Sequence, residues 1–172
     1  MTFGNLIHRP DLSPLFGPLS ADQNDHLLDR LLGIDAELLR LAERASIHVG
    51  VPYKALRLGL VLRADGTSAG IHGGPSGDAG DIWFDISPSG DAASGHPVGP
   101  PWVVESRLVV FCCDSPEPRG AANTHDLVRL EESADTPAAV LDVLASHVSL
   151  MRAELDRRPR ELFTMTPHSR LP

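Results

Sequence analysis

Cysteine is nearly absent from this sequence: the 172 residues contain two, Cys112 and Cys113, and these are adjacent. Successive side chains of a strand point to opposite faces, so neither a disulfide between the two nor shared ligation of a metal forms easily. No apolar segment approaches the roughly 18 residues that a membrane span requires, and the first residues lack the pattern of a signal peptide. We therefore expect a cytoplasmic protein in a reducing compartment.

Lysine is scarcer still, because Lys54 is the only lysine among 15 basic residues. This bias is typical of GC-rich coding and favours a bacterial source. The formal net charge of −8 opposes binding to nucleic acid and to anionic membranes, since phosphates would be repelled. The one dense basic cluster, Arg157, Arg158 and Arg160, is typical of a helix carboxyl terminus whose arginines complement the helix dipole. A nucleic-acid role through these residues and Arg152 is the weaker alternative, and we expect no membrane partner.

Motifs for cofactors and metals are also missing. The glycine-rich stretch 70–81 has neither the lysine and hydroxyl of a P-loop nor the glycine order of a dinucleotide-binding turn. We interpret it as a connection between strands, with a lid or recognition loop as the alternative. None of the eight histidines is spaced from another as a pair of metal ligands would be. The sequence predicts no cofactor and no metal.

One weak catalytic candidate remains. Cys113 is followed by Asp114, and His125 opens the next predicted strand across a loop. A thiol with an adjacent imidazole is the minimum for nucleophilic catalysis. Buried cysteines more often serve as small core residues, so inert packing is the favoured interpretation of Cys112 and Cys113.

The most informative stretch that is present covers residues 101–113, whose apolar and β-branched residues favour a buried strand. One face carries, around a single polar Ser106, the residues Trp102, Val104, Leu108, Val110 and Cys112. The opposite face is polar in its middle and apolar toward its carboxyl end, with Val103, Glu105, Arg107, Val109, Phe111 and Cys113. The pattern predicts a central strand of a sheet.

The remaining elements follow from periodicity and capping signals. A capping box at Ser20 and Gln23 begins a long helix, and Thr136 before Pro137 begins a second helix that runs to about residue 158. Between them we expect strands at 56–63, 67–72, 81–87 and 125–131, with a two-residue hairpin turn at Asp65 and Gly66.

This order predicts an α+β fold of two layers, in which an antiparallel meander sheet of four to five strands is packed by an N-terminal and a C-terminal long helix. Residues 1–19 are expected to form an extended, proline-rich arm without a helix, residues 20–158 a single domain, and residues 159–172 a tail.

The first long helix carries more leucine than one neighbour requires, because Leu28, Leu32 and Leu39 widen its apolar stripe. Trp83 shares a strand face with two aspartates and is a candidate interface anchor. We therefore hypothesise a non-enzymatic protein-binding module, such as an immunity protein, a chaperone or an assembly subunit, that forms a homodimer or a hetero-assembly. The alternative is a small-molecule enzyme or binding protein with a pocket between sheet and helices that uses Cys113 and His125.

Overall fold

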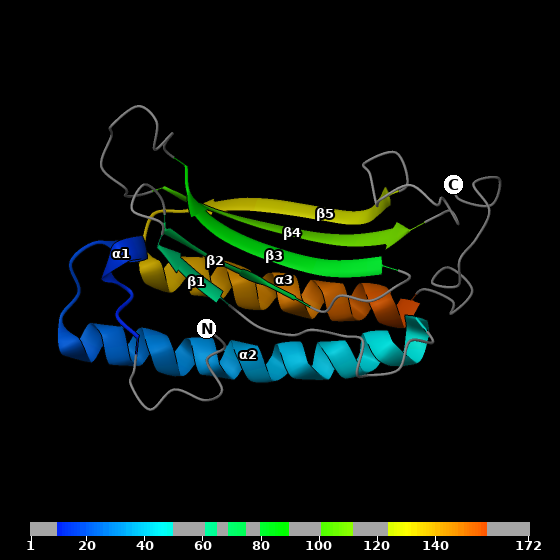
Figure 1. The fold of residues 1–172 in the computed structure, drawn as a ribbon, viewed down its shortest axis with the longest axis horizontal. Helices are drawn as coiled ribbons and strands as arrows, with labels where there is room; N and C mark the ends of the chain where they lie inside the picture. The colour runs from blue at the N-terminus through cyan, green and yellow to red at the C-terminus, as the bar shows by residue number, and fades with distance from the viewer. Residues whose placement is uncertain are drawn as a thin grey trace.

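The computed structural model describes residues 10–49, 61–64, 69–74, 80–89, 101–111 and 124–157. In chain order its elements are α1 (Ser13–Phe16), α2 (Ala21–Val49), β1 (Val61–Ala64), β2 (Ala69–Gly73), β3 (Gly80–Pro88), β4 (Trp102–Phe111), β5 (Thr124–Ala134) and α3 (Pro137–Arg157). The expected α+β class with an antiparallel sheet is confirmed. Both long helices lie on the same side of the sheet (Figure 1).

The sheet is an antiparallel meander in the order β1-β2-β3-β4-β5. β4 therefore has a neighbour on each side, as expected, although β3 is the middle strand. The predicted two-residue turn at Asp65 and Gly66 is wrong, because Ala64 pairs with Ala69 and four residues separate the paired positions. Residues 56–60 of the first predicted strand lie outside the described residues.

A β-bulge interrupts the pairing of β4 with β5. Leu108 pairs with Val128, but the next residue, Val109, pairs with Asp126, so that Leu127 is the extra residue. Strict alternation from Val128 would have turned Asp126 toward the helices. The bulge instead places Asp126 beside Val109 on the opposite face of the sheet, which is how bulges commonly redirect a side chain.

Both long helices begin as the sequence predicts. The amide of Gln23 donates to Ser20 Oγ at 3.2 Å, and the amide of Ser20 donates to Gln23 Oε1 at 2.9 Å, which completes the capping box. At the start of α3 the amide of Ala139 donates to Thr136 Oγ1 at 3.2 Å, with Pro137 in the first helical position. Each cap satisfies backbone amides that have no partner within the helix.

One hydrophobic cluster joins the sheet to the helices. From β4 it contains Trp102, Val104 and Leu108, each at most 2% exposed. α3 contacts β3, β4 and β5, and α2 packs against α3. Ion pairs at the surface link the two helices: Arg30 with Asp142, Arg152 with Glu37, and Arg44 with Asp156.

The prediction that residues 1–19 contain no helix is wrong for Ser13–Phe16, which form α1. Leu15 and Phe16 are buried in the same cluster as the sheet. The indole nitrogen of Trp102 donates to the carbonyl of Leu15 at 2.9 Å, and the ring of Phe16 packs edge-on against Trp102 with centroids 5.4 Å apart. This segment is therefore part of the core, because burial around Trp102 supplies the stabilisation that so short a helix lacks.

Candidate functional site

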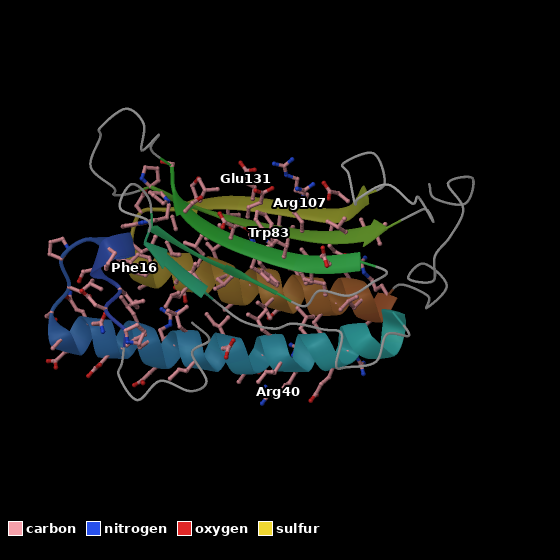
Figure 2. The ribbon with its side chains drawn as sticks, viewed as in Figure 1. Phe16, Arg40, Trp83, Arg107 and Glu131 are labelled. Atoms are coloured by element: carbon pink, nitrogen blue, oxygen red, sulfur yellow. The ribbon has the colours of Figure 1, made fainter. Side chains whose placement is uncertain are left out.

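The face of the sheet that points away from the helices is not covered by any element of the described chain. We call it the open face. Alternation along the strands assigns to it Asp81, Trp83, Asp85 and Ser87 of β3, Val103, Glu105, Arg107 and Val109 of β4, and Asp126, Arg129, Glu131 and Ser133 of β5. Figure 2 shows Trp83, Arg107 and Glu131 on this side of the sheet and Arg40 on the far side of α2.

The open face is ordered in rows that cross the strands. One row, which we call the basic row, consists of Trp83 paired with Arg107 and of Arg107 paired with Arg129. The adjacent row, the acidic row, has Asp85 paired with Glu105 and Glu105 paired with Glu131. Like charges thus lie directly opposite within a row, an arrangement that opposes strand pairing unless charges of the other sign lie nearby.

Diagonal ion pairs supply those opposite charges. Nε and Nη2 of Arg107 donate to the two carboxylate oxygens of Asp126, at 3.1 and 2.6 Å, and this ion pair holds the pKa of Arg107 above its ordinary value. Nε of Arg129 lies 3.1 Å from Glu105 Oε1. Side-chain exposures of 37% for Arg107 and 56% for Arg129 leave both guanidinium groups in contact with solvent. Such exposed pairs contribute little to stability, so they fix the orientation of the side chains more than they stabilise the fold.

The inner face of the sheet contains a second polar arrangement. Ser106 of β4 and His147 of α3 are both 0% exposed, and Ser106 Oγ lies 2.8 Å from His147 Nδ1. His147 Nε2 lies 3.4 Å from Glu132 Oε1. Because a carboxylate only accepts, Nε2 carries the proton, and the Ser106 hydroxyl donates to Nδ1. Burial lowers the pKa of His147, and the hydrogen bond to Glu132 opposes that shift.

Serine, histidine and glutamate are the residue types of a nucleophilic triad, but the burial of this set argues for a structural role. A nucleophile has to reach a substrate, and neither Ser106 nor His147 exposes any surface. The hydrogen bond between them gives a partner to the buried Ser106 hydroxyl and to the buried His147 Nδ1, whereas Glu132 is exposed to solvent. The sequence signal for this contact was the single polar Ser106 on an otherwise apolar strand face, because a buried hydroxyl requires a hydrogen-bond partner.

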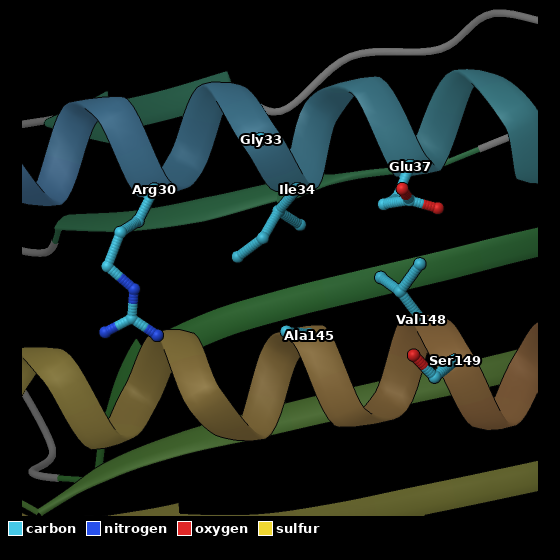
Figure 3. Close-up of a pocket in the computed structure, with 7 residues that line it drawn as sticks. All are labelled: Arg30, Gly33, Ile34, Glu37, Ala145, Val148 and Ser149. Atoms are coloured by element: carbon cyan, nitrogen blue, oxygen red, sulfur yellow. The ribbon is translucent and has the colours of Figure 1, made fainter.

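A cavity of about 250 Å³ lies between α2 and α3 (Figure 3). Its lining comes from the two helices, with no residue from the sheet: Arg30, Gly33, Ile34, Glu37, Ala145, Val148 and Ser149. A Cβ placed on Gly33 would meet nothing within 4 Å, so this glycine marks no close helix contact. Its missing side chain leaves the cavity hollow.

The predicted interface residues separate into three environments. Leu28 is 2% exposed and belongs to the core of its own chain. Leu32 and Leu39 are 41% and 42% exposed on α2, in the helical layer. Trp83 is partly exposed on the open face, on the other side of the sheet. No single flat interface includes both these leucines and Trp83.

The structure describes only part of the predicted catalytic set. Cys113 and Asp114 lie outside the described residues. His125 pairs through its backbone with Val110 near the end of β4, and its side chain is not described. Of the predicted basic cluster, Arg157 pairs with Glu154, whereas Arg158 and Arg160 lie outside the described residues.

Two other kinds of site are absent from the described residues. No three histidine, cysteine, aspartate or glutamate residues gather there as a metal site would require. None of the described helices is both long and apolar enough to cross a membrane.

Comparison of the chain with protein families, with curated proteins and with solved structures finds no match.

Proposed function

We propose that this chain is a protein-binding module without enzymatic activity, and that it binds through the open face. The observation that carries the proposal is the position of Trp83, partly exposed and flanked by Arg107 on a sheet face that no described element covers. Tryptophan and arginine are the residues most enriched among those that dominate binding energies. The polar side chains around them resemble the rim of an interface.

The two exposed leucines of α2 are the competing surface. Single exposed apolar residues are common on monomeric proteins and need no binding partner. Leu32 and Leu39 lie two turns apart, and Leu28 beside them is already buried. We therefore assign binding to the open face, with α2 and α3 together as the cover of the inner face. An immunity protein, a chaperone and an assembly subunit of a cytoplasmic bacterial system are the classes that this assignment fits.

Affinity capture from the source cell tests the assignment. The wild-type chain, Trp83→Ala and the double variant Leu32→Ser/Leu39→Ser are compared as baits, and bound proteins are quantified by mass spectrometry. We expect Trp83→Ala to capture at least about tenfold less of a specific partner than the wild type, because this variant loses one hot-spot residue. The leucine variant is expected to capture as much of that partner as the wild type. Retention by Trp83→Ala together with loss from the leucine variant would move the binding site to α2.

The alternative, an enzyme or small-molecule binding protein that uses Cys113 and His125, keeps one supporting observation. His125 pairs with Val110, three residues before Cys113, so the backbone of His125 lies near the strand end that leads to the thiol. An activated thiol has a lowered pKa and reacts fast near neutral pH. Alkylation rates of the wild type and of Cys113→Ser between pH 5 and 9 test it, and reactivity of an ordinary thiol would remove this alternative.

A further inference from the structure

The rows of the open face are complementary to a second copy of themselves, and we infer that the occupant of this face is another copy of the chain. The inference rests on the proposed function and names the partner of the same surface. Two sheets that pack face to face in a two-fold dimer share an axis in the plane between them. The direction and position of that axis decide which rows meet.

An axis parallel to the strands places each row over its own copy. Arg107 would then meet arginine and Glu105 would meet glutamate, which is repulsive. An axis that crosses the strands between the basic row and the acidic row exchanges them. Arg107 then lies over Glu105 of the second copy, and Arg129 lies over Glu131. By symmetry each of these pairs occurs twice.

The outer rows fit the same arrangement. On β4 the next residue pair is Val109 over Val103, an apolar contact that occurs twice. On β5 Asp126 lies over the hydroxyl of Ser133, and on β3 Asp81 lies over that of Ser87. The face has five carboxylates and two guanidinium groups. Of the three carboxylates in excess, this register places Asp126 and Asp81 opposite hydroxyl groups and Asp85 opposite Trp83, so that no two carboxylates lie opposite each other.

Spacing permits the contacts. Packed sheets lie about 10 Å apart, a gap that extended arginine and glutamate side chains bridge together. Aligned sheets rotate by about 30° relative to one another about the normal to the sheets, which displaces pairs far from the centre of the interface most. Arg107 and Glu105 flank the axis on β4, the middle one of the three strands, so theirs is the contact least affected. Asp126 accepts hydrogen bonds from Nε and Nη2 of Arg107. Nη1 of Arg107 has no hydrogen bond among the described residues, which leaves it for Glu105 of the second copy.

The size of the face sets the expected strength. Four rows at about 6.8 Å and three strands at about 4.8 Å give on the order of 400 Å² from each copy. Interfaces that bury less than about 1,200 Å² in total are weak. We therefore expect a dissociation constant in the micromolar range, roughly 1 to 100 µM.

Sedimentation equilibrium of the full chain over about 1 to 200 µM, a range set by that expected affinity, measures the dimer against the monomer mass of 18.5 kDa. Arg107→Glu and Glu105→Arg each place like charges over one another, and each is expected to raise the dissociation constant at least about tenfold. An equimolar mixture of the two variants restores opposite charges at both positions, so a heterodimer is expected at wild-type concentrations. Misfolding of either variant would not be repaired by mixing.

The matched control is Glu43→Arg, which makes the same change in charge at an exposed position of α2. It is expected to dimerise as the wild type does. A wild type that stays monomeric over the whole range overturns the inference, and so does a dimer that the charge reversals leave unchanged. Trp83-dependent capture of a different protein by a monomeric chain would still support the proposed function, so the two failures are distinguishable.

Discussion

The two faces of β4 differ in polarity, with one polar residue on the inner face and two charged residues on the outer face, and they meet different surroundings. On the inner face Trp102, Val104, Ser106 and Leu108 are each at most 2% exposed. On the outer face every described residue from Val103 to Val109 retains some exposure. The alternating backbone of a strand is the same for both faces. The difference therefore lies in what covers each face.

Polar residues show what this difference means. Ser106 on the inner face has a fixed partner in His147, because a buried hydroxyl without a partner costs about 1–3 kcal/mol. Arg107 on the outer face has an ion pair with Asp126, but water is also available to it. The inner face thus determines stability, whereas the outer face is free to determine specificity.

The two tryptophans give the largest contrast. Replacing Trp102 by Ala removes a buried ring, its hydrogen bond to Leu15 and its contact with Phe16. We expect the free energy of unfolding to fall by about 3–5 kcal/mol. Trp83→Ala on the open face is the matched control, with a smaller expected loss of about 1–2 kcal/mol because this ring is only partly buried. Urea unfolding followed by circular dichroism measures both, and equal losses would contradict the assignment of the faces.

The buried histidine predicts that the stability of the chain depends on pH. Burial lowers the pKa of His147 below its ordinary value of 6.5. As the pH falls through 6.5, the unfolded chain binds a proton at this histidine that the folded chain does not bind, so stability decreases. The decrease for one such group is at most about 1.4 kcal/mol per pH unit and stops below the folded-state pKa.

Denaturant unfolding between pH 5 and 8 measures this dependence. The control is the double variant Ser106→Ala/His147→Leu, which removes the imidazole without leaving the hydroxyl unpaired. The other histidines are present in both proteins, so the difference between the two curves isolates His147. Parallel curves would show that His147 takes up a proton in the folded chain as readily as in the unfolded chain.

Local patterns predicted much of this fold. The alternation of β4 predicted the burial of Trp102, and the capping box at Ser20 predicted the start of α2. What the sequence did not predict depends on contacts between distant residues. α1 is stabilised by Trp102, and Asn24 of α2 accepts from the amide of Leu12 at 2.8 Å. A helix of four residues is too short to be stable by local propensity alone, so its formation depends on these tertiary contacts and cannot be predicted from the local sequence.

The candidate site follows the same division. Trp83 was recognised because strand alternation placed it beside two aspartates. The basic row and the acidic row were not recognised, because identifying them requires knowledge of the register between β3, β4 and β5. The bulge at Leu127 also escaped prediction, since no glycine or proline marks it. Register and bulges are properties of strand pairs, and a single sequence specifies them only through both strands at once.

The smallest predicted effect concerns the residue that this bulge turns outward. Asp126→Asn removes the charge that pairs with Arg107 while keeping the size of the side chain. Because both partners are about one third exposed, at 37% and 31%, the loss in the free energy of unfolding is expected to stay below about 1 kcal/mol and to shrink in high salt. Unfolding curves at low and high ionic strength measure it. A loss of several kcal/mol would mean that the pair is covered by protein, and the open face would then not be open.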